Sequence, residues 1–214
     1  MLRRRCPLCS EDVAASAIRA YGRDYFDCPT CRLVFLAPPA RLDADAERAH
    51  YLTHENDPHD PRYRAFLDRL ALPLITHLVP GAQGLDFGSG PGPTLSLMLE
   101  ERGFPTEIYD PFFAPNSSVL EKNYDFITAT ETIEHFCHPE KEFVRLDELL
   151  RPGGILGVMT EIFRDDKPFA QWHYPRDPTH VSFYREKTMQ WIAQRFSYAV
   201  EMPRPNVVLF RKGA

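Results

Sequence analysis

Gly-Leu-Asp-Phe-Gly-Ser-Gly-Pro-Gly, at residues 84–92, is the stretch around which this chain is organised. Apolar residues flank Asp86 in a short run that breaks into alternating glycines, which is typical of a buried strand entering a tight loop. Pro93 suits the first turn of a helix, and apolar residues then recur at helical spacing until Gly103. Such an arrangement lets a ligand approach the backbone and points unpaired N–H groups at its anionic part. The sequence therefore predicts a ligand site at this loop.

Spacing separates the ligand classes that use glycine-rich loops. The dinucleotide fingerprint G-x-G-x-x-G needs a third glycine five positions after the first, and counted from Gly88 this position holds Pro93. A P-loop ends in Gly-Lys-Ser/Thr, whereas the first lysine of the chain is Lys122. The remaining pattern, Leu-Asp-x-Gly-x-Gly-x-Gly, resembles the first motif of the class I S-adenosylmethionine-dependent methyltransferases. A loop that only turns a sheet is the alternative.

This resemblance implies a fold, a cofactor and a set of contacts. The fold is an α/β, doubly wound, mostly parallel Rossmann-like sheet that ends in an antiparallel hairpin, and the cofactor is S-adenosyl-L-methionine. In that family the loop packs against the methionyl part and the ribose of the cofactor. The cofactor-binding residues expected here are Asp86, Gly88, Ser89, Gly90, Gly92, Asp110, Pro111, Phe112, Thr130 and Glu131.

Asp110 ends the second expected strand, residues 106–110. A carboxylate at that place can accept both ribose hydroxyls, and a turn residue at the strand end is the alternative. Only residues 111–123 separate Asp110 from the next apolar strand, which is too few for a crossover helix and another strand. We therefore expect the third strand to be shortened or missing. Phe112 and Phe113 are then candidates for stacking on adenine, with a core position as the alternative.

Length and composition limit the classes of function. The 214 residues suffice for one α/β domain with a small appendage, and no apolar run approaches the ~20 residues that span a bilayer. The arginine-rich start leads directly to Cys6 without the apolar core of a signal peptide, so we expect a cytoplasmic protein that does not bind membranes. With a net charge of −5 the whole molecule lacks the basic charge typical of nucleic-acid-binding proteins, but this value does not exclude a local basic patch.

Two Cys-Pro-x-Cys turns run from Cys6 to Cys9 and from Cys28 to Cys31. Their separation is in the range of a four-cysteine zinc site, and each turn can place two thiolates on one tetrahedral ion. Four cysteine ligands leave no open position, so we expect structural zinc in a small zinc ribbon. Two disulfides are the competing explanation, which a reducing compartment disfavours. Cys137 is expected to be a small buried residue.

Composition also suggests the division of the chain. We expect a zinc ribbon at residues 1–37, a linker and lid helix at 38–59, and the S-adenosylmethionine-binding domain at 60–214. In the methyltransferases that the chain resembles, helices before the first strand cover the cofactor. Candidate lid residues on this basis are Tyr51, His54 and Tyr63, and solvated helix positions are their alternative.

A second motif occupies residues 124–136, where an Asp-apolar-apolar strand leads into Glu-x-x-Glu-His-apolar. It resembles the fourth-strand motif of the same family and stands at the right distance before the Arg-Pro-Gly-Gly turn at 151–154. In related enzymes the chain after the fourth strand faces the sulfonium and the substrate. Glu131, Glu134 and His135 are therefore active-site candidates, with helix capping as the alternative for Glu134.

Residues 165–184 form a long connection that is dense in aromatic, acidic and histidine side chains. Long loops of this kind are typically functional, and a cap that encloses the acceptor fits the composition. A histidine there can take the acceptor's proton. Its acids and histidines also suggest a metal site, but their spacing matches no ligand pattern. The candidate catalytic residues are His180, His173 and His135.

The sequence thus predicts methyl transfer from S-adenosylmethionine to an unidentified, small-molecule acceptor. Positioning supplies most of the rate in such a displacement, and a general base is needed only if the acceptor must lose a proton. One alternative is an RNA or protein methyltransferase that holds its substrate with the ribbon. Against it, residues 1–37 carry six arginines and four acids, too small an excess to bind a phosphate backbone well. The other alternative is a non-catalytic scaffold that retains the fold.

Overall fold

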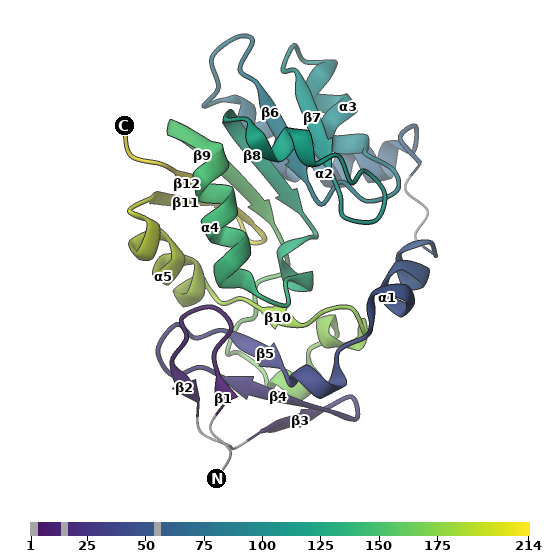
Figure 1. Cartoon of the computed structure of the whole chain (residues 1–214), viewed down its shortest axis with the longest axis vertical. Coiled ribbons are helices and arrows are strands. Elements are labelled where there is room, and N and C mark those ends of the chain that lie inside the picture. Colours follow the sequence, from purple (N-terminus) through teal and green to yellow (C-terminus); the bar gives the residue numbers. More distant parts are fainter. Residues whose placement is uncertain (1–3, 14–16, 54–56) are drawn as a thin grey trace.

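The computed structural model describes residues 4–13, 17–53 and 57–214. Figure 1 shows two parts, a six-stranded sheet with its helices and a smaller group of strands near the N-terminus. Within the described ranges, no helix is both long enough and apolar enough to cross a membrane.

The large sheet has the strand order β11-β12-β9-β8-β6-β7. Its strands β7, β6, β8 and β9 run parallel, whereas β12 pairs antiparallel with both β9 and β11. A mostly parallel sheet with a C-terminal antiparallel hairpin, as expected from the sequence, is therefore confirmed. The strand bounds are β6 Gly84–Phe87, β7 Thr106–Tyr109, β8 Tyr124–Thr130, β9 Leu150–Met159, β11 Ala199–Arg204 and β12 Val207–Arg211.

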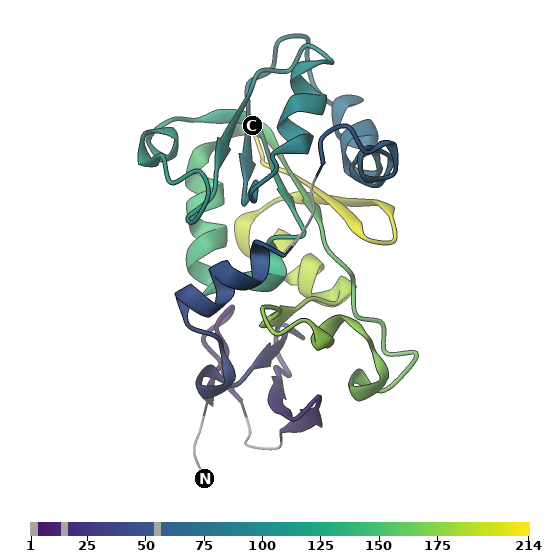
Figure 2. The ribbon, with the colours of Figure 1, turned by 90° about the vertical axis from the view of Figure 1, so that its right-hand side faces the viewer.

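Helices cover both faces of this sheet because its strands point alternate side chains into two apolar layers. Ile127 and Leu156 belong to the layer under α4 and α5, and their neighbours Phe126 and Ile155 belong to the layer under α2 and α3. Figure 2 shows α4 and α2 on opposite sides of the strands. The doubly wound architecture is thus confirmed. The helix bounds are α2 Pro61–Ile75, α3 Thr94–Glu100, α4 Pro139–Leu149 and α5 Glu186–Phe196.

β7 is an edge strand, and no described strand pairs with its outer side. The chain that follows forms an isolated bridge between Asp110 and Ala114 and then a short 3₁₀ helix, η2 (Ser117–Glu121). The shortened third-strand region expected from the length of this connection is confirmed. A tight loop at residues 110–114 therefore stands beside the end of β7, where a longer crossover was not possible.

The N-terminal strands form two small sheets. One sheet pairs β1 with β2, and the other has the order β10-β5-β4-β3. Its outer strand β10 comes from the long connection at residues 165–184, here called the cap segment. The helix α1 (Ala44–Tyr51) follows η1 (Pro38–Ala40) and lies between the small sheet and the end of the large one (Figures 1 and 2). The bounds are β1 Arg4–Arg5, β2 Asp12–Val13, β3 Ile18–Ala20, β4 Arg23–Asp27, β5 Val34–Leu36 and β10 Ser182–Phe183.

Arg185 fastens the N-terminal strands to the cap segment. Its buried guanidinium donates to both carboxylate oxygens of Asp27, at 2.8 and 3.1 Å, and to Asp165 at 3.0 Å. A bidentate pair of this kind fixes orientation as well as charge. The N-terminal strands thus share a sheet and an ion-pair cluster with residues 165–185, and the division at residue 37 stays a prediction.

Candidate active site

A cavity of about 620 Å³ lies at the carboxyl ends of β6, β7 and β8. Ligands of open α/β sheets bind at this edge, where the loops after neighbouring parallel strands meet. The structure brings together here every residue that the sequence predicts for cofactor binding. These lining residues are Asp86, Gly88, Ser89, Gly90, Gly92, Asp110, Pro111, Phe112, Thr130 and Glu131.

The glycine loop needs its glycines for two separate reasons. Gly88 and Gly90 have φ of +78° and +64°, in the left-handed region that side chains rarely adopt. In addition, a Cβ on Gly88 would lie 2.2 Å from Cγ2 of Thr132, so the loop after β8 packs directly against this backbone. The N–H groups of Gly88 and Ser89 both donate to the Tyr109 carbonyl, at 2.7 and 3.2 Å, which ties the loop to the end of β7.

The Asp110 carboxylate is held by backbone donors. Oδ1 accepts the N–H groups of Phe112 and Phe113 at 2.8 and 3.0 Å, and Oδ2 accepts the N–H of Gly90 at 3.0 Å. A carboxylate offers about four acceptor positions, so one position on Oδ2 remains. This geometry favours a contact with one ribose hydroxyl, where the sequence suggested both.

Two buried hydroxyls at the cavity wall have no hydrogen-bond partner, Ser89 Oγ and Thr130 Oγ1. Buried polar atoms in folded proteins are nearly always paired, so these two atoms indicate a polar ligand. Nearby, Asp86 is buried and accepts a hydrogen bond from Thr128 Oγ1 at 2.7 Å. Burial raises the pKa of Asp86 to about 6, against the effect of this hydrogen bond. The residues present thus fit a polar cofactor such as S-adenosylmethionine.

The helix α1 supplies part of the cavity wall. The Tyr51 ring packs against Phe112 and His135, with centroids 5.9 and 5.2 Å apart, and its hydroxyl donates to Glu47 at 2.6 Å. Tyr63 of α2 also lines the cavity, whereas the third lid candidate, His54, lies outside the described residues. One lid candidate therefore contacts a predicted cofactor residue and a predicted catalytic residue.

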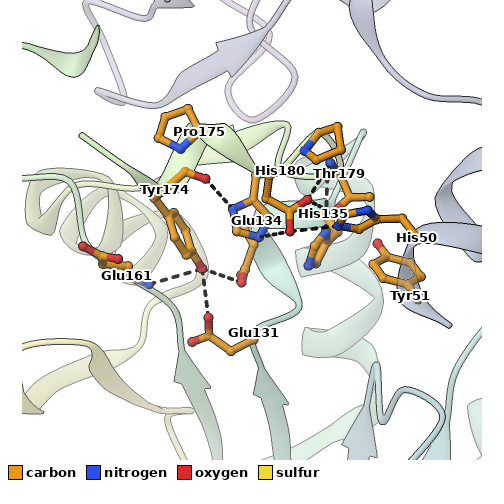
Figure 3. Close-up of polar contacts among 12 residues, drawn as sticks. His50, Tyr51, Glu131, Glu134, His135, Glu161, Tyr174, Pro175, Thr179 and His180 are labelled. Carbon is orange, nitrogen blue, oxygen red and sulfur yellow. Dashed lines mark hydrogen bonds and ion pairs between the residues drawn. The ribbon is translucent and has the colours of Figure 1, made fainter. Parts of the chain in front are cut away.

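The Tyr174 hydroxyl bridges two carboxyl side chains, Glu131 of the cavity lining and the buried Glu134 (Figure 3). The Tyr174 hydroxyl donates to Glu134 Oε1 at 2.5 Å, and Glu131 Oε2 lies 3.2 Å from the same hydroxyl. Thr160 donates to the second Glu134 oxygen at 2.9 Å. Burial and the neighbouring Glu134 charge raise the pKa of Glu131 to about 9, so its carboxyl is protonated at neutral pH. Glu134 therefore accepts side-chain hydroxyls and does not cap a helix.

His180 and His135 face this end of the cavity from different segments. Each directs Nδ1 at a main-chain carbonyl, His180 at Tyr174 O (2.9 Å) and His135 at Thr179 O (3.2 Å). A nitrogen that faces a carbonyl carries the proton, so in both neutral rings Nε2 is an acceptor. Burial lowers the pKa of His180 below its ordinary value, although the Glu134 charge opposes this shift.

Asp177 links the cap to α1. Its Oδ2 lies 3.1 Å from His50 Nε2 and 4.0 Å from His180 Nε2, and its Oδ1 accepts the N–H and hydroxyl of Thr179. Burial would raise the pKa of Asp177, but the Thr179 hydrogen bonds and the two histidines hold it well below its usual range. Asp177 is therefore an anion at the rim of the cavity.

A family model described as a methyltransferase domain matches residues 51–201. The chain belongs to this family. It is therefore a S-adenosylmethionine-dependent methyltransferase, as its glycine loop and fourth-strand motif predicted. No curated protein matches it.

Solved structures support the fold. The methyltransferase superposes with a TM-score of 0.54 on the 1,6-didemethyltoxoflavin-N1-methyltransferase of Burkholderia thailandensis, solved with 1,6-didemethyltoxoflavin and S-adenosylhomocysteine, at 18% identity over 94% of this chain and 100% of that one. A SAM-dependent methyltransferase from Archaeoglobus fulgidus gives a TM-score of 0.54 at 15% identity, over 70% of this chain and 94% of that one. The PH0226 protein of Pyrococcus horikoshii gives a TM-score of 0.53 at 16% identity, over 78% of this chain and 99% of that one. At these low identities, the superpositions show a shared fold and say nothing about the substrate.

The four cysteines near the N-terminus of the methyltransferase form one cluster. Their sulfurs all lie within 4.8 Å of one another, with Cys6 to Cys31 and Cys9 to Cys28 both at 3.5 Å, and none forms a disulfide. The two turns have the same backbone hydrogen bond. The N–H of Ser10 donates to the Cys6 carbonyl and the N–H of Arg32 donates to the Cys28 carbonyl, both at 3.0 Å. The predicted convergence of four thiols is confirmed, and the disulfide alternative is wrong for this arrangement.

The histidine candidates divide into two groups. His135 and His180 line the cavity with ring centroids 4.9 Å apart, but His173 is not among the lining residues. The His173 side chain is 64% exposed and pairs with Glu161 Oε2 at 3.1 Å. The structure therefore places two of the three predicted catalytic histidines together and the third on the surface of the cap.

Residues beside the cavity were also missed from the sequence. His50 and Glu47 of α1 were not singled out, because nothing local marks them: Asp177, the partner of His50, is 127 residues away, and Glu47 pairs with Tyr51 of its own helix. Thr132 was also missed, although its contact with Gly88 fixes the spacing between the two family motifs. Its place two residues after β8, opposite the first loop glycine, was the available signal.

Proposed function

We propose that this enzyme transfers the methyl group of S-adenosylmethionine to a small-molecule acceptor held between α1 and the cap segment. One observation carries the proposal: a single cavity has two hydroxyls without partners, Ser89 Oγ and Thr130 Oγ1, beside the glycine loop, and it is also lined by two histidines, His135 and His180. Its volume of about 620 Å³ is in the usual range for small-ligand sites, which supports a small acceptor over a macromolecule. When bound, the cofactor supplies a methyl group already activated by a positively charged sulfur.

The residues of the proposed cofactor end bind and orient. Gly88, Gly90 and Gly92 allow the loop backbone to approach the cofactor closely, and Ser89 and Thr130 offer hydroxyls that need partners. Asp110 accepts a ribose hydroxyl. Further contacts come from Asp86, Pro111, Phe112 and the protonated carboxyl of Glu131, all of which line the same wall.

The histidines of the proposed acceptor end handle the acceptor's reacting group. His180 presents a lone pair at Nε2 because its Nδ1–H is held by the Tyr174 carbonyl, so it can accept a hydrogen bond or a proton. His135 is oriented in the same way from the other side. His173 remains a weaker proposal, since it would have to move to reach the cavity.

We also propose that the cysteine cluster holds structural zinc. Sulfurs of a tetrahedral ion with Zn–S bonds of ~2.3 Å are ~3.8 Å apart, close to the observed 3.5 Å. Such a thiolate site persists in a reducing compartment, so the proposal includes a cytoplasmic location. The ion would stabilise the turns that pack against the start of α4, where Ser10 donates to Glu140 at 3.0 Å.

A screen of metabolite pools with methyl-labelled cofactor tests the proposed activity. We expect label to enter a small molecule with the wild-type enzyme, and the rate to fall at least tenfold in His180→Ala. His77→Ala is the control, because it removes an imidazole that lies outside the cavity lining and pairs with Glu201. Label recovered only in RNA or protein would contradict the proposed acceptor class, and equal rates in both variants would remove His180 from the site.

A further inference from the structure

Three side chains at the acceptor end bring one potential ligand atom each to the same place. These atoms, from Glu134, His135 and His180, all lie within 4.8 Å of one another. Nδ1 of both rings faces a main-chain carbonyl, which leaves Nε2 as the acceptor, and a carboxylate oxygen is an acceptor as well. Acceptor atoms gathered this closely repel one another, so a cation among them would stabilise the group.

The groups behind these three side chains match the surroundings of metal ligands. Metal-ligating histidines usually donate their other ring N–H to a carbonyl or carboxylate, and ligating carboxylates are themselves hydrogen-bonded. His180 and His135 direct Nδ1 at the Tyr174 and Thr179 carbonyls. Glu134 receives the hydroxyls of Tyr174 and Thr160 and keeps one acceptor position on each oxygen. All three side chains are thus oriented by partners that leave the converging atoms available.

Charge around the cluster favours a cation as well. Among the described residues, no lysine or arginine forms an ion pair with the fully buried Glu134. The Asp177 anion lies 4.0 Å from His180 Nε2, and Asp177 also contacts Thr179 and His50. Buried charges are normally paired or coordinate metals. Figure 3 shows the cluster lying between Tyr174 on one side and His50 and Tyr51 on the other.

We propose that Glu134, His135 and His180 bind one divalent transition-metal ion, and that the methyl acceptor is a small molecule that ligates this ion through oxygen or nitrogen. The inference deepens the proposed function and rests on it. Two imidazoles and one carboxylate suit ions such as Zn²⁺, Fe²⁺ or Co²⁺ and leave positions open for a substrate atom. The two histidines line the cavity, so those positions face the acceptor space.

The ion gives the two histidines a defined role in the transfer. An acceptor O–H or N–H bound to the ion loses its proton to solvent, because the positive charge lowers its pKa. The acceptor atom then forms the bond to the methyl carbon as the carbon–sulfur bond breaks, and that electron pair stays on sulfur. With the ion bound, the Nε2 lone pairs of the histidines hold the ion instead of accepting the acceptor's proton, and no separate base is required.

Metal content of the full-length enzyme tests the site. Protein purified under reducing conditions is equilibrated with Zn²⁺, desalted and measured by mass spectrometry of the metal. We expect His135→Asn and His180→Asn each to hold one ion fewer per chain than wild type. Asparagine keeps a donor near the position of Nδ1 and removes Nε2, so the carbonyl contacts can persist. His173→Asn, at the exposed histidine, should hold as many ions as wild type.

Loading with Co²⁺ separates this site from the cysteine cluster. Thiolate-to-cobalt charge-transfer absorption reports the cysteines, so we expect it to be unchanged in both cavity variants, whereas the visible absorption that a second cobalt ion adds in wild type is lost. Equal metal content in wild type and both variants, or a wild-type spectrum made by thiolates alone, overturns the site. Binding of S-adenosylhomocysteine distinguishes the two claims. If that ligand binds and no second ion is found, the metal site fails and the methyltransferase function stands; if it does not bind, the proposed function fails whatever the metal content.

Discussion

The two ends of one cavity are built in different ways. At the cofactor end, backbone N–H groups of consecutive residues tie the loop to Tyr109 and Asp110, and the shape depends on glycines whose added Cβ would clash or be strained. At the acceptor end the wall is made of side chains from α1, η3 (Ile133–His135) and the cap segment, brought together across 40 to 127 residues of sequence. A backbone site tolerates most side-chain changes except at its glycines, whereas a side-chain site can change its substrate by single substitutions.

The largest effect is expected for Gly88→Ala. The new Cβ would lie 2.2 Å from Cγ2 of Thr132, so the loop must move away from β8. The alanine would also have to keep the positive φ of Gly88. We expect binding of S-adenosylhomocysteine to be lost in calorimetric titration and the melting temperature to fall. Gly103→Ala is the matched control, because Gly103 has φ of +86° with nothing within 4 Å of its Cβ position. That variant should lose about 1 kcal/mol of stability from backbone strain and bind normally. Similar behaviour of the two variants would contradict the role of close packing at Gly88.

Asp110→Asn should have an intermediate effect at the same end. An amide nitrogen cannot accept the Gly90 N–H or a ribose hydroxyl, and hydrogen bonds to a charged group contribute about 1.5–3 kcal/mol. We therefore expect the Kd for S-adenosylhomocysteine to rise roughly 10- to 100-fold. Glu107→Gln neutralises an acid of the same strand that does not line the cavity, and should leave this Kd unchanged. An unchanged Kd in Asp110→Asn would remove that carboxylate from the cofactor.

Glu131→Gln tests the boundary between the two ends, because Glu131 lines the cofactor end and contacts Tyr174 beside Glu134. With no ion at Glu134, the folded pKa of Glu131 is raised to about 9, so between its unfolded pKa of ~4.3 and this value the folded state binds up to one more proton than the unfolded state. The contribution of Glu131 to the free energy of unfolding is therefore fully present below pH ~4.3 and is lost as the pH rises towards 9. We expect denaturant titrations to show wild-type stability falling between pH 6 and 9 by at most ~1.4 kcal/mol per pH unit, and a weaker fall in the variant. Parallel curves would show that Glu131 is ionised in the folded enzyme.

Local patterns were enough to predict the cofactor end and the fold. The glycine loop, the strand ending at Asp110 and the Glu-x-x-Glu-His motif each occupy a few consecutive residues, so their geometry follows from short-range chemistry. The missing third strand could be predicted because thirteen residues are too short for a crossover. The cysteine cluster followed from two identical turns.

The acceptor end could be predicted only as a list of residues. The sequence alone gives no reason to prefer His180 over His173 as a cavity residue. The path of the cap segment decides between them, because it places β10 against β5 and His180 against Tyr174. The bond from Tyr174 to Glu134 depends on how far that segment folds back over β9, and no local pattern encodes this. The choice among these side chains needed the tertiary structure.

Calorimetric titration of the wild-type enzyme with S-adenosylhomocysteine decides whether the cavity beside the glycine loop binds the cofactor. We expect one binding site per chain, with binding lost in Gly88→Ala and retained in Gly103→Ala. Absence of binding in a folded wild-type protein, shown by a cooperative melting transition in the same sample, would contradict it.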